Sequence, residues 1–147
     1  MAAGRAWLAV GGLLSAAASL LHLACIAGGP RWYRFLGAGE KLASAAERRE
    51  RWPALVTSGI AGVLAVWAAY AFSGAALLPR LPLLRFVLVA ITAAYLLRGA
   101  VLFFPDALRR PDLSRAFLFW SSLVVLTVGV VHAVGVANLF NEPIGVS

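Results

Sequence analysis

Four side chains that can carry charge or exchange protons lie within otherwise apolar runs: His22, Arg85, Arg98 and His132. Ionisable side chains at membrane depth are costly and often mark ligand or ion sites. No Asp or Glu lies within these runs, so neither arginine has a carboxylate partner at its own depth. The pattern therefore favours an anion or polar-ligand site over a Ser-His-Asp triad, which would lack its acid.

One predicted site lies in the half of the membrane domain that contains His22 and Arg98. Each lies about six residues from the same end of the bundle, or roughly 9 Å inside the core boundary. Two simpler interpretations remain: Arg98 can extend along its stem to the headgroups, and His22 can be a hydrogen-bonded packing residue. The predicted ligand-binding residues are His22, Thr57, Ser58, Tyr95, Arg98, Ser121 and Ser122.

A second predicted group, Tyr70, Arg85 and His132, lies toward the opposite face. A haem with two axial histidines needs both at one depth, but His22 and His132 differ by about 15 Å in projected height. No cofactor and no metal are therefore predicted. Cys25 is the single cysteine, which excludes an internal disulfide, a CxxC pair and zinc sites with two cysteine ligands.

Composition places the chain in a bilayer. Of 147 residues, 62% are hydrophobic and 13% are charged, which is too apolar for a soluble domain of this size. The net charge is +7, but the basic residues cluster at the ends of apolar runs, where membrane topology requires them. Anionic lipid headgroups, and not nucleic acid, are the expected partners.

The elements that must position these residues are four helices, expected at about 6–27, 53–78, 81–104 and 116–140. Arg5 and the alanines 16–18 also suit a secretory signal peptide, but the apolar run continues past them, which favours a retained span. Short connections predict an all-α integral membrane protein, an antiparallel four-helix transmembrane bundle, as a single domain over 1–147.

Small and polar residues predict which helix faces point inward, because helices associate in a bilayer through close packing and hydrogen bonds. In the first helix these residues are Gly11, Ser15, Ser19 and His22, and in the second they are Ser58 and Gly62, with Ala61, Ala65 and Ala69 close by. In the third helix they are Arg85, Thr92, Tyr95 and Gly99, and in the fourth they are Ser122, Val125, Gly129, His132 and Val136.

The polar segment 28–52 interrupts the apolar sequence between the first two helices. Apolar spacing within it predicts a short amphipathic interfacial helix at about 35–49, with a solvated loop as the alternative. Residues 37–39, Gly-Ala-Gly, lack the preceding strand and glycine spacing of a nucleotide-binding motif. The predicted lipid-headgroup contacts are Arg34, Lys41, Arg48, Arg49 and Arg51.

The distribution of Lys and Arg predicts the orientation. Ten of these residues lie at the end that holds the first and third connections, and three lie at the other end. Since basic loops stay in the cytoplasm, both termini are expected outside the cytoplasm and the protein in the cell inner membrane.

The chain resembles small four-span inner-membrane proteins of bacteria that carry no assigned activity. The residues behind this resemblance are His22, the segment WYRFLGAGE from Trp32 to Glu40, and LLRG from Leu96 to Gly99. The resemblance implies a multi-pass inner-membrane protein and carries over no function.

These observations favour a non-enzymatic scaffold, accessory or lipid-interacting module. One alternative is binding or transport of a small anionic or amphipathic solute, in a homo-oligomer or with a larger membrane partner. A second alternative is a membrane enzyme or redox partner that uses His22 or His132.

Overall fold

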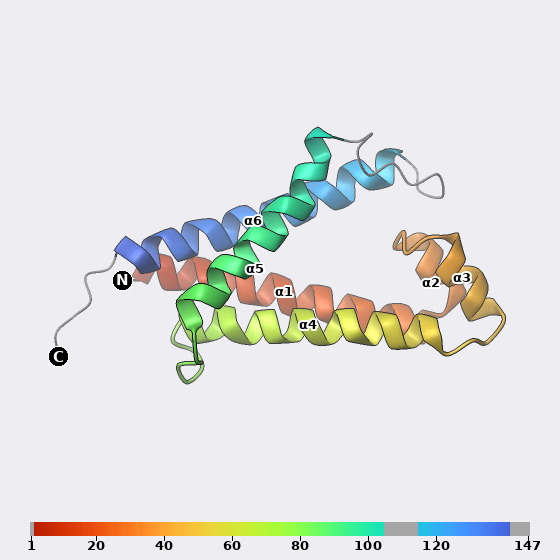
Figure 1. Cartoon of the computed structure of the whole chain (residues 1–147), viewed down its shortest axis with the longest axis horizontal. Coiled ribbons are helices and arrows are strands. Elements are labelled where there is room, and N and C mark those ends of the chain that lie inside the picture. The colour runs from red at the N-terminus through yellow and green to blue at the C-terminus, as the bar shows by residue number, and fades with distance from the viewer. Residues whose placement is uncertain (1, 105–114, 142–147) are drawn as a thin grey trace.

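The computed structural model describes residues 2–104 and 115–141, and within these ranges every regular element is helical. The long helices are α1 (Ala2–Gly28), α4 (Trp52–Gly74), α5 (Leu84–Gly99) and α6 (Arg115–Asn141). Each is long and apolar enough to cross a membrane, α5 together with the following 3₁₀ turn η1 (Ala100–Phe103). They run up and down, with the start of α1 and the end of α6 at the same end of the bundle (Figure 1). The prediction of an antiparallel four-helix transmembrane fold is confirmed.

The second and third apolar helices, α4 and α5, are shorter than the ranges 53–78 and 81–104 predicted from the sequence. α4 ends at Gly74 because Ala76 adopts a left-handed backbone conformation and Ser73 then holds the turn. The Ser73 hydroxyl donates to Pro79 O at 2.8 Å and accepts from Leu81 N at 3.0 Å. α5 begins only after Leu83, which is also left-handed.

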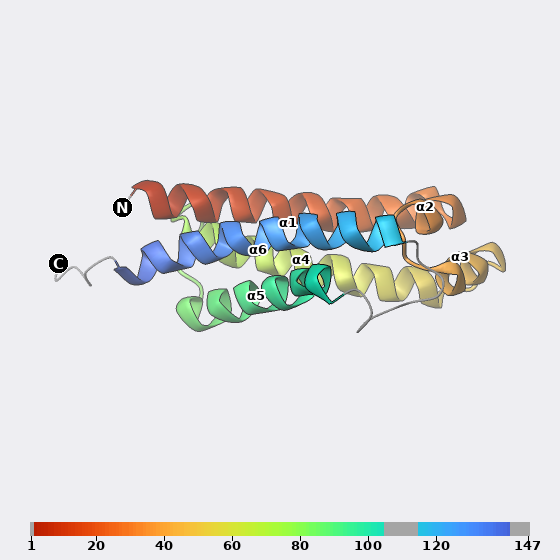
Figure 2. The ribbon, with the colours of Figure 1, turned by 90° about the horizontal axis from the view of Figure 1, so that it is seen from above.

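The four helices form two pairs that meet at one end and diverge at the other. α1 lies along α4, α5 packs obliquely across α6, and α1 joins the pairs through its contact with α6 (Figures 1 and 2). An apolar cluster closes the end where α1 begins and α6 ends: Leu8, Ala75, Leu84, Leu88 and Val136. At the opposite end α5 and the start of α6 tilt away from α1 and α4 (Figure 1).

The inward face of α1 is the one expected, but the inward face of α4 is not. Gly11, Ser15 and Ser19 are buried, and Ser19 donates a hydrogen bond to Ala61 O at 2.8 Å. Ser58 and Gly62 are instead exposed on α4, and Thr57, Ala61, Leu64 and Ala68 are buried. The predicted face and the buried face of α4 are a quarter to a third of a turn apart around the helix axis. The positions of small residues were therefore not sufficient to predict how this helix is rotated about its axis.

The polar segment forms two short helices, α2 (Pro30–Phe35) and α3 (Glu40–Glu47), where one helix at 35–49 was expected. Gly37 and Gly39 break the helix, because their φ angles of +66° and +95° lie where glycine is favoured. The α2–α3 segment, residues 30–47, packs on the end of α1 through Cys25, Tyr33 and Ala43. Gly37 also contacts the ring of Phe117 at the start of α6, where a Cβ would collide with it.

Candidate functional site

A polar and aromatic cluster lies in the middle of the bundle and takes one residue from each long helix. The hydroxyls of Ser15 on α1 and Tyr95 on α5 are 2.9 Å apart, within hydrogen-bond distance. The Tyr95 ring packs edge-on against Trp67 of α4, with centroids 5.0 Å apart, and lies 5.2 Å from the ring of His132 on α6. Ser15 and His132 are completely buried. This central cluster therefore fixes all four helices relative to one another.

His132 has one satisfied ring nitrogen and one free one. Nδ1 lies 2.9 Å from Val128 O, and because a carbonyl only accepts, the proton is assigned to Nδ1. Nε2 is buried and has no partner within the described ranges, so its lone pair is available. The ring packs on the backbone of Gly11, where a Cβ would lie 2.7 Å from Cε1. A buried unpaired nitrogen of this kind can accept a proton or a hydrogen bond.

The structure joins two residues of the first predicted group directly. Arg98 Nη1, in the last turn of α5, donates to the hydroxyl of Ser122 on α6 at 3.1 Å. Tyr95, predicted in the same group, lies in the central cluster with His132 of the second group. Three others bond to carbonyls of their own helices: His22 to Ala18, Thr57 to Pro53, and Ser121 to Leu118; Ser58 is exposed.

The other two residues of the second predicted group lie near the closed end of the bundle. The guanidinium of Arg85 stacks 5.2 Å from the centroid of the Phe140 ring. The Tyr70 hydroxyl donates to Pro82 O at 3.3 Å. The contacts of Tyr70 and Arg85 described here are therefore with Pro82 and Phe140, whereas His132 lies against Tyr95.

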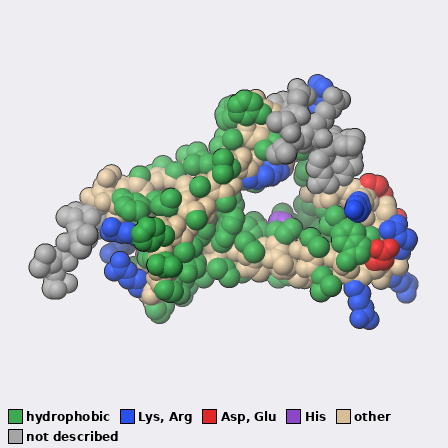
Figure 3. Space-filling model, in the orientation of Figure 1, with side chains coloured by type: hydrophobic (Ala, Val, Ile, Leu, Met, Phe, Trp, Pro, Cys, Tyr) green, Lys and Arg blue, Asp and Glu red, His purple; other side chains and the backbone are tan. Residues whose placement is uncertain are grey.

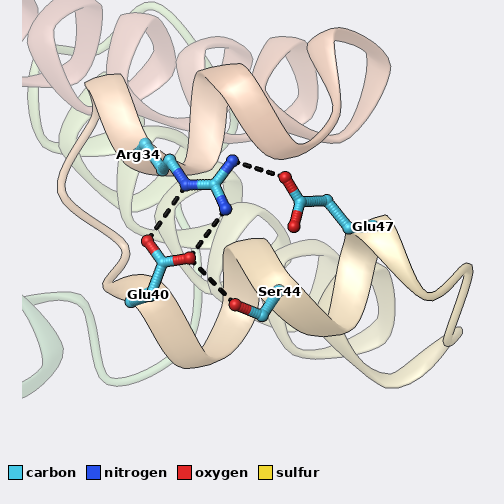
Figure 4. A network of polar contacts seen from close by, with 4 residues as sticks. All are labelled: Arg34, Glu40, Ser44 and Glu47. Atoms are coloured by element: carbon cyan, nitrogen blue, oxygen red, sulfur yellow. Dashed lines mark hydrogen bonds and ion pairs between the residues drawn. The ribbon is translucent and has the colours of Figure 1, made fainter.

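Ion pairs hold the α2–α3 segment together. Arg34 donates from Nε and Nη2 to the two carboxylate oxygens of Glu40, at 3.0 and 2.7 Å, and from Nη1 to Glu47 at 2.6 Å (Figure 4). Ser44 adds a hydrogen bond to Glu40 at 2.9 Å. The guanidinium of Arg34 therefore bridges the two ends of α3 to α2.

The charged partners stabilise the ionised carboxylates. Hydrogen bonds from Arg34 and then Ser44 lower the pKa of Glu40 to about 2, from an ordinary value of 4.5. Arg34 also lowers the pKa of Glu47, and both carboxylates raise the pKa of Arg34. The stabilising effect of Glu40 is therefore fully present above about pH 4.5 and is lost as the pH falls through about 2.

We expect acid to loosen the α2–α3 segment over that pH window. A spin label at Lys41, introduced as cysteine with Cys25 replaced by serine, should become more mobile as the pH falls from 4.5 toward 2. The same label in the Arg34→Gln background should be mobile at every pH in this range, because the ion pairs are already absent. An immobile label at pH 7 in Arg34→Gln would show that the ion pairs do not order the segment.

The predicted headgroup residues divide into paired and unpaired cations. Arg34 is paired as above, and Arg48 donates from Nε to Glu50 at 2.6 Å. Lys41, Arg49 and Arg51 are exposed and form no ion pair with any residue that the structure describes. Arg31 in α2, not included in the prediction, is equally exposed and unpaired within those ranges. The three carboxylates of this region are thus neutralised by only two of its six cations.

A small cavity of about 180 Å³ lies where this segment meets α1 and α4. Arg49 and Glu50 supply its charged lining, and the rest is lined by Ile26, Gly29, Pro30, Tyr33, Ala46, Pro53 and Ala54. Glu50 is ionised, because hydrogen bonds from Arg48 and then Trp52 lower its pKa. The cavity therefore offers one positive and one negative group beside apolar side chains.

The chain matches no protein-family model, no curated protein and no solved structure. No three His, Cys, Asp or Glu residues among those described lie close enough together to hold a metal ion.

Sequence reasoning missed Ser15 and Trp67 as partners of Tyr95. The signal for Ser15 was its position on the same face of α1 as Ser19 and His22.

Proposed function

We propose that the protein is a non-enzymatic, lipid-interacting module of the cell inner membrane. Its α2–α3 segment and the following turn bind anionic headgroups on the cytoplasmic side, and both termini lie on the other side. This orientation is supported by the excess of Lys and Arg at the end of the bundle that holds the segment.

The observation that carries this proposal is the set of unpaired cations beside exposed aromatic side chains. Arg31, Lys41, Arg49 and Arg51 are exposed and form no ion pair with a residue of the described ranges, which leaves them available to an external partner. Nearby in α2, Trp32 is 42% exposed and Phe35 is 81% exposed. Aromatic side chains suit the depth of the headgroups, and each basic residue at an anionic surface contributes about 1 kcal/mol.

The cavity at Arg49 supports the same function. A guanidinium and a carboxylate face one small space, and apolar residues from the ends of α1 and α4 complete its wall. A lipid headgroup combines a phosphate, polar groups and an adjoining apolar chain, so the cavity matches its chemistry.

We expect the triple variant Lys41→Gln, Arg49→Gln and Arg51→Gln to lose preference for anionic lipid. The measurement is the association of spin-labelled phosphatidylglycerol, relative to phosphatidylcholine, with the reconstituted protein. For a bound lipid that contacts one of the replaced residues, the preference for phosphatidylglycerol over phosphatidylcholine should fall about fivefold. Raising the salt concentration should reduce the wild-type preference toward that of the variant, because the interaction is screened.

The matched control removes three charges from the other end, as Arg5→Gln, Arg80→Gln and Arg85→Gln. A much smaller change in this control would place the headgroup contacts on the α2–α3 side. Equal losses in the two triple variants would contradict the proposal, because the lipid preference would then follow total charge alone.

A further inference from the structure

Arg98 is a cation within a membrane-spanning segment. It lies five residues before Phe103, the end of the third apolar span, or about 8 Å along the helix. Among the residues that the structure describes, Arg98 donates a hydrogen bond to Ser122, which is completely buried on α6. A guanidinium has five N–H donors, and the bond to Ser122 uses one of them.

No described carboxylate neutralises Arg98. The carboxylates of the described ranges are Glu40, Glu47 and Glu50, and all three are paired with Arg34 or Arg48 in the α2–α3 region. A charge at this depth is costly, and intramembrane arginines usually face a bundle interior or a water-filled cavity and bind a partner there. Within the described ranges Arg98 therefore has no counter-ion, which leaves its charge available to an anionic ligand.

A hollow lies where the two helix pairs diverge. Figure 1 shows α5 and the start of α6 tilting away from α1 and α4 at the end where Arg98 lies. Figure 3 shows the hollow from the side, with mostly hydrophobic walls, a basic side chain beneath α5 and a histidine on the opposite wall. A space bounded by helices of a membrane bundle is accessible to lipid from the side.

We propose that this hollow binds one anionic phospholipid, with its phosphate on Arg98 and an acyl chain against the apolar walls. The planar guanidinium donates two parallel hydrogen bonds to a phosphate, a geometry that Lys does not reproduce. The Ser122 hydroxyl orients the guanidinium from α6. This site lies between the two helix pairs, on residues of α5 and α6, and is therefore separate from the headgroup surface of the α2–α3 segment.

The test is titration of the detergent-solubilised full-length protein with dioctanoyl phosphatidic acid, followed by native mass spectrometry. We expect one bound lipid per chain that depends on Arg98, in addition to any lipid held at the α2–α3 segment. Arg98→Gln should weaken binding about tenfold or more, since a hydrogen bond to a charged group contributes about 1.5–3 kcal/mol. Arg98→Lys keeps the charge and should lose less affinity than Arg98→Gln, and Ser122→Ala should lose affinity with Arg98 retained.

Two controls separate this site from others. Arg85→Gln removes a charge from the other end of the same helix and should leave the affinity unchanged. Arg49→Gln removes a cation of the proposed headgroup surface, so it should weaken lipid binding there and spare the lipid that depends on Arg98; either proposal can then fail without the other. Gel filtration of each variant confirms that it remains folded.

Two comparison ligands identify what the site recognises. Dioctanoylglycerol, which lacks the phosphate, and inorganic phosphate, which lacks the chains, should each bind much more weakly than the lipid. Inorganic phosphate that binds as tightly as the lipid would overturn the proposal in favour of a free anion. Folded Arg98→Gln with wild-type affinity would overturn it in favour of an arginine that only extends to the membrane surface.

Discussion

Replacing Gly99 with valine is expected to destabilise the protein by about 3 kcal/mol, because α5 and α6 touch there through their backbones. A Cβ at Gly99 would lie 2.6 Å from Leu126 Cα and 2.8 Å from Leu126 N. Backbone atoms of a packed helix cannot move aside as a side chain does. The extra methyl groups of valine must therefore push the two helices apart, which can be measured as a lower midpoint of thermal unfolding in detergent.

The control for this prediction is a glycine with open space around it. A Cβ at Gly62 on α4 meets nothing within 4 Å, so Gly62→Val should leave the midpoint close to that of the wild type. The comparison also tests the pairing of the helices. If Gly99→Val were as stable as Gly62→Val, then α5 would not approach α6 at this point.

The number, type and direction of the helices could be predicted because they depend on long-range composition. Runs of about 20 apolar residues separated by charged segments are sufficient for that purpose. The buried face of α1 was also predictable, because Gly11, Ser15 and Ser19 recur at a spacing of four, which places small residues on one side of the helix.

Rotation and tilt were harder to predict. Tyr95 was grouped with Arg98 because they are one turn apart, yet the tilt of α5 turns Tyr95 toward Ser15 and His132. Every residue of α4 near its middle is small or apolar, so the pattern did not distinguish the face of Ser58 from that of Ala61. Local sequence gives depth along a helix, whereas lateral contacts depend on how all four helices pack.

The α2–α3 segment shows a second limit. Apolar spacing over 35–49 is helical, and α3 does occupy most of that range. The break arises from Gly37, whose left-handed backbone lets the chain turn and whose missing side chain admits the ring of Phe117. This contact is about 80 residues away in sequence, so no local pattern could reveal it.

Truncating Tyr95 to alanine should also destabilise the protein by about 3 kcal/mol, through loss of the ring at the centre of the bundle. The ring contacts Trp67 and His132, and its removal leaves a cavity between four helices. Tyr95→Phe keeps the ring and removes only the hydroxyl, so its cost should be near 1 kcal/mol, as for other hydrogen bonds between membrane helices. Equilibrium unfolding in mixed micelles measures both values.

A double-mutant cycle with Ser15→Ala then isolates the bond between the two hydroxyls. Each single change leaves one buried hydroxyl without its partner, whereas the double variant Ser15→Ala with Tyr95→Phe removes both polar groups together. The double variant should therefore lose clearly less stability than the sum of the two single variants. Strict additivity would mean that the two hydroxyls do not interact, and the central cluster would then be held by ring packing alone.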